Sequence, residues 1–299
     1  MAGQSNLLTE FSRGGVLLDG GMGSMLIAAG LKMGSPPEEW NRSRPEVVRG
    51  IHESYLDAGA RFIETNTFGC TPSRMTGFGL GDDLAELNNA AVRLAREAVD
   101  KLNGSGGDRY VVLSIGPTGK MLAPVGDATE DDIRADYEGQ LGCLTESVDL
   151  ILIETIFDLK EGLIGLEAAR RHSDAPVAVT MTFSKNPRGF FTIMGNAAAD
   201  SLRQLEQAGA DIVGANCTLA SDEMVELAAV LRDSTGLPLL CQPNAGKPTV
   251  KHGLPVYEQT AAEFAEDAGR LYAAGINAVG GCCGTTPNFI REVYSKLNN

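Results

Sequence analysis

The stretch Leu150-Ile-Leu-Ile-Glu-Thr155 is apolar at its first four positions and ends in a carboxylate and a hydroxyl, and a helical pattern over Asp158–Arg171 follows it. An apolar run without polar alternation is typical of a parallel strand that is buried on both faces. Further β-rich runs, most of them continuously apolar, alternate with helical patterns along the chain. We predict eight strands at Val16–Gly20, Arg61–Thr65, Tyr110–Ile115, Leu150–Thr155, Val177–Phe183, Asp211–Ala215, Leu237–Gln242 and Asn277–Gly281.

Helical patterns fill the intervals, and three of them end in the same way. The segments Asp57-Ala-Gly-Ala60, Gln207-Ala-Gly-Ala210 and Ala273-Ala-Gly-Ile276 each place a glycine after a helix and just before a strand. Ser221 is a candidate N-cap for the helix that it begins. We predict the helices at Pro45–Asp57, Leu84–Leu102, Glu130–Ser147, Asp158–Arg171, Ala197–Ala208, Ser221–Asp233, Ala261–Ala273 and Asn288–Leu297.

This alternation predicts the fold class. Eight strand–helix units in a chain of 299 residues favour a closed α/β barrel, the (β/α)8 TIM barrel, with residues 1–299 as a single domain. An open doubly wound sheet is the alternative. The segment Gly21-Met-Gly-Ser-Met-Leu26 follows the first strand, but it lacks the third glycine of a dinucleotide-binding fingerprint.

The composition limits partners and location. Hydrophobic residues make up 43% of the chain, which is ordinary for a soluble globular protein, and no apolar run approaches the roughly 20 residues that a membrane span requires. The N-terminal segment has no positive patch before an apolar stretch, so we expect a cytoplasmic protein. The net charge of −14 argues against a nucleic-acid partner, because phosphate binding requires clustered Lys and Arg.

Polar residues gather at the predicted strand ends, which is where a (β/α)8 barrel carries its active site. Only strand seven separates strands six and eight, so their ends and the loop between them converge on one point. Consecutive residues of a regular strand point to opposite faces, but flanking glycines let the backbone leave strand geometry at Cys282-Cys283. The polar residues are Asp19, Glu64, Asn66, Glu154, Cys217, Asn244, Cys282 and Cys283.

Three cysteines at this point, Cys217, Cys282 and Cys283, would make a soft, anionic site that suits zinc. Three protein ligands leave a fourth position for substrate, which is typical of a catalytic site. Such a zinc ion favours an incoming thiol over water, because a coordinating thiol is deprotonated. The cysteines therefore predict attack by a substrate thiolate on an electrophilic methyl group. Buried core cysteines or a vicinal disulfide are the alternatives for the adjacent pair.

Five segments together resemble the homocysteine S-methyltransferase family, from about Gly15 to Leu297. They are Leu18-Asp-Gly-Gly-Met-Gly-Ser24, Ile63-Glu-Thr-Asn-Thr-Phe68, Asn216-Cys-Thr218, Pro243-Asn-Ala-Gly246 and Gly280-Gly-Cys-Cys-Gly-Thr-Thr-Pro287. Within the family, the segment Pro243–Pro248 and the paired cysteines most resemble the homocysteine-binding module of cobalamin-dependent methionine synthase. The resemblance implies a zinc-dependent enzyme that methylates homocysteine to methionine. A similar small thiol is the alternative substrate.

The resemblance also implies the ligands and the donor. Cys217, Cys282 and Cys283 would ligate zinc, and Asn244 would be a weak fourth ligand until the substrate thiol displaces it, with turn chemistry as the alternative for Asn244. We expect a methyl-corrinoid (cobalamin) donor on a separate protein, because the chain has no Asp-x-His-x-x-Gly string. The alternatives are donation by S-methylmethionine, S-adenosylmethionine or betaine, a binding subunit that is inert without a corrinoid protein, a demethylating subunit, and a redox or structural zinc protein.

Substrate contacts are predicted at the ends of strands one, two and four. By the resemblance, Asp19 and Glu154 would hold the substrate ammonium, although Asp19 alone is also explained as a turn cap. We predict further contacts from Glu64 and Asn66, with ordering of loops as the alternative for Glu64. The substrate carboxylate would meet the backbone amides of Gly20, Gly21, Met22 and Gly23.

The other cysteines and the histidines lie outside these motifs. We expect Cys143 and Cys241 to be small core residues. His52, His172 and His252 show no ligand spacing, and we expect His52 and His172 at the surface or at helix ends.

Overall fold

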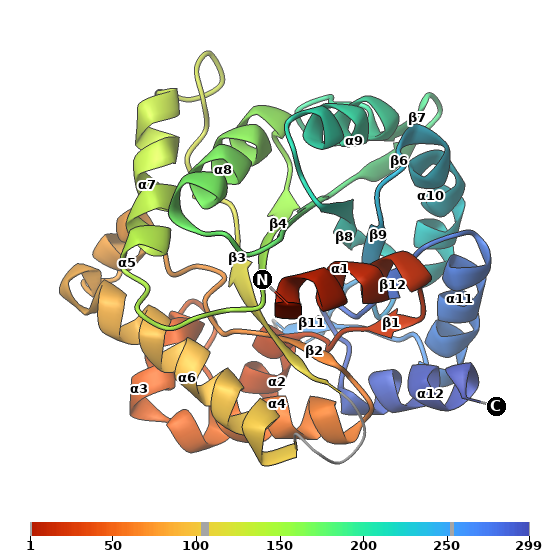
Figure 1. Cartoon of the computed structure of the whole chain (residues 1–299), viewed down its shortest axis with the longest axis horizontal. Coiled ribbons are helices and arrows are strands. Elements are labelled where there is room, and N and C mark those ends of the chain that lie inside the picture. The colour runs from red at the N-terminus through yellow and green to blue at the C-terminus, as the bar shows by residue number, and fades with distance from the viewer. Residues whose placement is uncertain (1, 103–107, 252–253, 299) are drawn as a thin grey trace.

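Eight parallel strands close into a barrel. The computed structural model of the chain describes residues 2–102, 108–251 and 254–298. The strands pair in the order β1-β12-β9-β8-β5-β4-β3-β2, and a parallel bridge from Leu18 to Phe62 joins the two ends of the sheet (Figure 1). The predicted TIM barrel is confirmed, and the open alternative is wrong. The barrel strands are β1 (Val16–Leu17), β2 (Phe62–Glu64), β3 (Tyr110–Ile115), β4 (Leu150–Ile156), β5 (Val177–Met181), β8 (Ile212–Ala220), β9 (Leu239–Asn244) and β12 (Ala278–Val279).

A ring of helices surrounds the strands. These are α4 (Pro45–Asp57), α6 (Leu84–Leu102), α7 (Glu130–Gly142), α8 (Leu159–His172), α9 (Ala198–Gln207), α10 (Ser221–Ser234), α11 (Ala261–Ala273) and α12 (Pro287–Leu297). Proline begins α4 and α12, where its missing N–H leaves no partner unsatisfied. Gly59, Gly209 and Gly275 follow three of the helices with left-handed backbone (φ 107°, 93° and 90°), as the repeated turn predicts.

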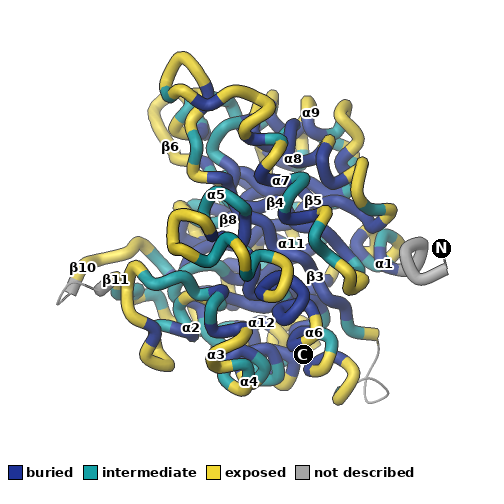
Figure 2. Tube along the Cα trace, turned by 90° about the vertical axis from the view of Figure 1, so that its left-hand side faces the viewer, coloured by how far each residue is buried: buried dark blue, intermediate teal, exposed yellow. Residues whose placement is uncertain are grey.

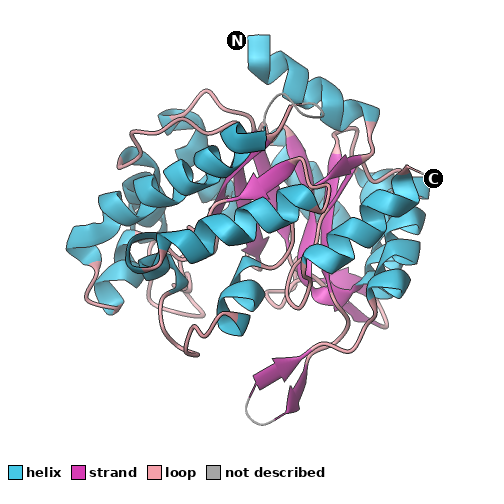
Figure 3. Cartoon of the chain, turned by 90° about the horizontal axis from the view of Figure 1, so that it is seen from below, coloured by secondary structure: helices cyan, strands magenta, loops and turns pink. Residues whose placement is uncertain are grey.

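The remaining elements lie at the two ends of the barrel. They are α1 (Ala2–Arg13), α2 (Met22–Ala28), η1 (Pro37–Glu39), α3 (Trp40–Ser43), α5 (Pro72–Gly77), η2 (Gly81–Asp83), β6 (Ser184–Asn186), β7 (Gly189–Phe191), β10 (Thr249–Lys251) and β11 (Leu254–Val256). The hairpin of β10 and β11 projects from one end, and α1 lies at the opposite end (Figure 3). Over the described ranges, none of the helices combines the length and apolar character that a bilayer crossing requires.

Alternate strand side chains form two separate parts of the core. Outward residues such as Val111 and Ile151 pack in the layer between strands and helices. Inward residues form a second cluster, which Leu7 and Phe11 of α1 join, so this helix closes the amino-terminal end of the lumen; Figure 2 shows the strands as the buried centre. The lumen cluster is Leu7, Phe11, Val16, Leu18, Phe62, Tyr110, Val112, Leu150, Leu152, Ala178, Ile212, Leu240 and Ala278.

The end of α7 and the cap of α10 differ from the prediction because distant side chains take up backbone or hydroxyl groups. α7 ends at Gly142, earlier than predicted, because the Asn89 side chain accepts the backbone N–H of Thr145 at 2.7 Å. Ser221 is the first residue of α10 rather than its N-cap, and its hydroxyl donates instead to the buried Asp267 on α11. Both differences depend on partners that are remote in the sequence.

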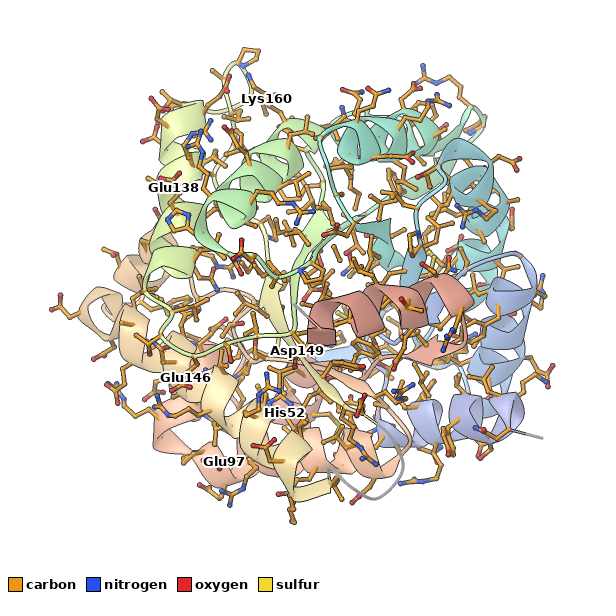
Figure 4. The ribbon with its side chains drawn as sticks, viewed as in Figure 1. His52, Glu97, Glu138, Glu146, Asp149 and Lys160 are labelled. Carbon is orange, nitrogen blue, oxygen red and sulfur yellow. The ribbon has the colours of Figure 1, made fainter. Side chains whose placement is uncertain are left out.

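His52 is not at the surface, and that prediction is wrong. It lies within α4 (Figure 4) and is completely buried, and within the described part of the chain neither ring nitrogen has a hydrogen-bond partner. Burial lowers the pKa of its imidazole to about 4. Glu97 and Glu138, also labelled in Figure 4, instead form surface ion pairs with Arg49 and Arg171. His252 lies outside the described residues.

Candidate functional site

A bulge at the end of β8 places the first cysteine. The pairing of β8 with β9 shifts register between Asn216 and Ala220, so β8 continues past its predicted end at Ala215. Within the bulge, Cys217 and Thr218 have left-handed backbone (φ 60° and 57°), which residues other than glycine adopt at an energetic cost. Cys217 is therefore a half-buried residue inside an irregular strand rather than the residue at a strand end.

The other two cysteines lie in the loop between β12 and α12, as predicted. This loop runs along the end of β9, where the N–H of Cys282 donates to the Pro243 carbonyl at 2.9 Å. The N–H of Ala245 donates in turn to the Cys283 carbonyl at 3.0 Å. The hydroxyl of Thr285 donates to the Cys282 carbonyl at 2.6 Å and closes the turn. The loop is thus held in place by hydrogen bonds to the backbone groups of both cysteines.

The three cysteines meet. The sulfur atoms of Cys217, Cys282 and Cys283 all lie within 4.8 Å of one another, and none of the three is in a disulfide. A tetrahedral zinc ion with sulfur at about 2.3 Å needs its ligands on the order of 4 Å apart, so this donor set fits the metal. Hydrogen bonds from the thiols of Cys217 and Cys282 hold the pKa of Cys283 far below its usual range, which favours a thiolate in the cluster.

Asn244 and Tyr257 border the cysteine cluster. The side-chain oxygen of the buried Asn244 accepts the backbone N–H of Cys283 at 3.1 Å, which brings it beside the cluster; its role as a metal ligand stays a prediction. The ring of Tyr257 covers Gly284, where a Cβ would lie 2.3 Å from it, and its side chain hydrogen-bonds that of Cys283. Sequence reasoning missed Tyr257, because it lies outside the recognised segments.

Three carboxyl groups lie at the carboxyl-terminal end of the lumen. Oδ2 of Asp19 accepts the backbone N–H of Glu64 at 2.9 Å, and Oε1 of Glu64 accepts from the Gln242 amide at 2.5 Å. Glu154 accepts from the Ser114 hydroxyl at 2.5 Å. Oε2 of Glu154 also accepts a hydrogen bond from the side-chain amide of Asn216 at 2.9 Å. The structure thus brings Asp19, Glu64 and Glu154 close enough for their charges to interact, as the barrel topology predicts.

Burial and mutual repulsion act on these carboxyls. Burial raises the pKa of Glu154 to about 7, and burial together with the charge of Glu154 raises the pKa values of Asp19 and Glu64 well above their usual range. None of the ion pairs between described residues includes any of the three. Buried carboxyls are rare without a charged partner, so this region is suited to binding a cationic group.

The glycine segment after β1 fits closely against the cysteine loop. A Cβ on Gly20 would lie 2.6 Å from the Thr285 hydroxyl, so the position admits no side chain. The N–H of Gly21 donates to the same hydroxyl at 3.0 Å. The hydroxyl of Ser24 accepts the N–H of Gly284 at 2.9 Å. These contacts attach the start of α2 to the loop that carries two of the cysteines.

The predicted substrate contacts of this segment and of Asn66 differ in their surroundings. Met22 and Gly23 begin α2, where backbone N–H groups lack helical partners. Asn66 is turned toward η1 and α3: its amide donates to the Pro37 carbonyl and to Asn41 Oδ1, both at 2.9 Å. Asn66 therefore holds a loop in place in this structure, and its contact with substrate stays a prediction.

A layer of polar residues lines the lumen, and four of its members, Ser114, Thr180, Asn216 and Gln242, were not among the predicted site residues. Each follows an inward apolar residue by two or four positions on the same strand, so it points into the lumen as well. In the sequence, these residues are marked by a change from apolar to polar side chains at the alternate, inward-facing positions of a strand. The layer is Glu64, Ser114, Glu154, Thr180, Asn216 and Gln242.

The fold and the site define a class of protein, namely a (β/α)8 barrel with a three-cysteine candidate metal centre at the carboxyl ends of its strands. Comparison with protein families makes the assignment narrower, since the model for homocysteine S-methyltransferase matches residues 16–297. The chain belongs to the homocysteine S-methyltransferase family and is a methyltransferase.

Known proteins agree with this assignment. The methionine synthases of Mycobacterium tuberculosis and Mycobacterium leprae are 34% and 33% identical over 99% and 98% of the chain, which spans only 26% and 25% of their lengths. The metallated homocysteine methyltransferase MmuM of Escherichia coli matches with a TM-score of 0.80 at 25% identity, covering 94% of this chain and 95% of that one. The carboxyl transferase domain of Rhizobium etli pyruvate carboxylase shares the fold alone, with a TM-score of 0.56, 15% identity, and coverage of 98% and 49%.

Proposed function

We propose that this chain is a zinc-dependent enzyme that methylates homocysteine to methionine, with residues 1–299 as one cytoplasmic domain. The observation that carries the proposal is the convergence of three cysteine sulfurs within 4.8 Å, next to buried carboxyls with raised pKa values that form no ion pair with another described residue. A zinc ion held by Cys217, Cys282 and Cys283 would supply Lewis-acid activation of the substrate thiol as a thiolate. The remaining steps are binding and orientation by the chain.

Asp19 and Glu154 bind the substrate ammonium in this proposal. Oδ1 of Asp19 and Oε1 of Gln242 are buried, and neither has a hydrogen-bond partner among the described residues. An ammonium group offers three donors and a positive charge, so it satisfies such acceptors and returns the raised carboxyls to their ionised state. Glu64 contributes negative charge from the third side. A structural zinc site would need none of these carboxyls.

The α-carboxylate of the substrate is bound by backbone amides of the glycine segment. Gly21 precedes α2, and its own N–H is engaged by Thr285. The amides of Met22 and Gly23 at the start of the helix are therefore the donors that we assign to the carboxylate. This arrangement orients the amino acid with its thiol toward the cysteines.

We propose a methyl-corrinoid on a separate protein as the donor. The name methionine synthase of the mycobacterial relatives supports this choice, although the chain spans about a quarter of their length. A partner that docks at the loops following the barrel strands would cover large apolar side chains that are exposed there. These side chains are Met33, Phe78, Met121, Val125, Ile193 and Val250.

Calorimetry tests the thiol chemistry. Homocysteine should release about one proton when it binds to the zinc-loaded chain near neutral pH, because the metal takes the thiolate. Titrations in buffers of different ionisation enthalpy count that proton. 4-Mercaptobutyrate has the same carbon chain as homocysteine without the ammonium and should bind about tenfold more weakly or worse. Absence of proton release would refute thiolate activation, and equal affinity for the two thiols would refute the carboxylate roles.

An assay of the purified chain identifies the donor. Homocysteine is offered separately with methylcobalamin, S-methylmethionine, S-adenosylmethionine and betaine, and methionine is measured. We expect turnover with methylcobalamin. Fast turnover with a sulfonium or with betaine, and none with methylcobalamin, would overturn the donor assignment and leave the thiol chemistry standing. The reverse direction is measured by supplying methionine with the reduced corrinoid.

A further inference from the structure

Asn216 joins three strands inside the lumen. It directly precedes Cys217 and is 1% exposed. Its oxygen accepts the backbone N–H of Thr155 on β4 at 2.7 Å and the hydroxyl of Thr180 on β5 at 2.9 Å. Its nitrogen donates to Oε2 of Glu154 at 2.9 Å and to the hydroxyl of Thr155 at 2.8 Å. The amide thus uses both lone pairs and both hydrogens on fixed partners.

These contacts connect the two halves of the candidate site. Thr155 and Cys217 both have left-handed backbone with φ 60°, a conformation that persists only where surrounding contacts enforce it. Where the pairing of β4 with β5 shifts register, the Asn216 side chain accepts the Thr155 N–H. One side chain therefore constrains the backbone next to a cysteine of the cluster and the carboxylate of Glu154.

We propose that Asn216 is a positioning residue that sets the span between the sulfur of Cys217 and the carboxylate of Glu154, and that this span selects homocysteine over the shorter cysteine. The inference rests on the proposed function for what the two groups bind. Homocysteine has one methylene more than cysteine between its α-carbon and its thiol, so a fixed span accommodates one and strains the other. Pocket shape discriminates one methylene by about 10- to 200-fold, provided that the pocket is rigid.

Three variants of the full chain test the role. Asn216→Ser removes the amide, and Thr180→Val removes one of its donors while preserving side-chain shape. Asn89→Ser is the matched control: Asn89 is also a buried asparagine that uses both ends of its amide, but its partners are Ala85, Cys143, Thr145 and Glu146. Zinc affinity is measured by chelator competition, and the dissociation constants of homocysteine and cysteine by calorimetry on zinc-loaded protein. Thermal melting monitors folding.

Wild type should bind homocysteine more tightly than cysteine. Asn216→Ser should lower zinc affinity about 10- to 100-fold, the range typical of residues that orient metal ligands, and should reduce the homocysteine preference about tenfold. Thr180→Val should change both in the same direction by a smaller factor. Asn89→Ser should lower the melting temperature and leave zinc affinity and thiol preference at the wild-type values.

The opposite pattern overturns the inference. If Asn216→Ser kept wild-type zinc affinity and preference while melting earlier, the amide would be structural alone. The inference is also overturned if Asn89→Ser changes the preference for homocysteine over cysteine as much as Asn216→Ser does. If wild type bound zinc but neither thiol, the proposed function would fail separately. The zinc affinity of Asn216→Ser would then decide the point, with a loss supporting the positioning of Cys217 and no loss rejecting it.

Discussion

The two ends of the barrel lumen are built by the same strands and have opposite chemistry. At the amino-terminal end, the rings of Phe11 and Phe62 meet edge to face at 5.1 Å, and Phe62 stacks on Tyr110 at 4.6 Å. At the carboxyl-terminal end the inward positions carry carboxyl, amide and hydroxyl groups. On β4 the change takes one alternate step, from Leu152 to Glu154, both of them buried.

This difference places the residues that stabilise the fold at the amino-terminal end of the lumen and the residues that we expect to bind substrate at the carboxyl-terminal end. Apolar burial at the α1 end favours folding by about 25 cal/mol per Å² of surface removed from water. Burial of Asp19, Glu64 and Glu154 opposes folding, which is why it raises their pKa values. Substitutions at the polar end should therefore change binding and activity most, whereas substitutions at the apolar end should change stability alone.

The largest effect is expected at the cysteine cluster. Cys217→Ser, Cys282→Ser and Cys283→Ser should each lose zinc and reduce methyl transfer by more than about 100-fold, since losing a ligand exceeds the effect of losing its outer-shell partners. The barrel should persist, because the lumen cluster does not include these residues. Metal analysis and circular dichroism measure both. Cys143→Ser is the control, and full zinc occupancy in all three variants would reject the site.

At the apolar end, Phe11→Ala should destabilise the chain by about 3–5 kcal/mol, because it leaves a cavity where α1 closes the lumen. Zinc and homocysteine affinities should stay at wild-type values. Denaturant unfolding and calorimetry give the two numbers. Phe78→Ala, at a half-exposed ring, should cost far less. A loss of homocysteine affinity in folded Phe11→Ala would show that the two ends are coupled.

Glu154→Gln should weaken homocysteine binding about 10- to 100-fold and stabilise the ligand-free chain. The pKa of Glu154 is about 7 in the fold against an ordinary 4.5, so its contribution to stability is lost as pH rises from 4.5 through 7. The variant should gain up to about 3 kcal/mol at pH 8 and nothing near pH 4. Asp19→Asn should act in the same direction.

Glu161→Gln is the control for these carboxyl variants. Glu161 is also buried with a raised pKa, but it lies on α8 and accepts from Thr118 and Tyr137. It should alter stability without altering homocysteine affinity. Calorimetry and melting curves at pH 4, 6 and 8 distinguish the cases, and a pH-independent gain in Glu154→Gln would contradict the assigned cause.

The smallest effect is expected at His52, a buried residue that lies on α4 and belongs to neither end of the lumen. His52→Leu should stabilise the chain at every pH, because neither ring nitrogen has a hydrogen-bond partner in the part of the chain that the structure describes. The folded pKa of about 4 lies below the ordinary 6.5, so the stability of wild type is lost as pH falls from 6.5 through 4. The gain should therefore be about 2 kcal/mol larger at pH 5 than at pH 8. Equal gains at both values would exclude the titration.

Local pattern was enough where neighbouring residues decide an element. The bounds of β3 (Tyr110–Ile115) and α4 (Pro45–Asp57) agree with the prediction at both ends, because an apolar run or a proline start and glycine stop defines them. The bulge at Cys217 was not predictable in this way. It depends on a contact between Asn216 and Thr155, 61 positions apart, which no local pattern contains.

The sequence by itself determined the repeated strand–helix unit and the chemistry of the strand ends, because periodicity, turn glycines and thiol side chains are properties of short segments. Only the tertiary structure decided that the sulfurs of Cys217, Cys282 and Cys283 meet within 4.8 Å and that Asn216 connects them to Glu154. It also decided that His52 is buried and that Asn66 turns toward α3. The physical reason is common to all four: burial and hydrogen-bond geometry are set by residues from other strands and helices, which become neighbours only when the barrel closes.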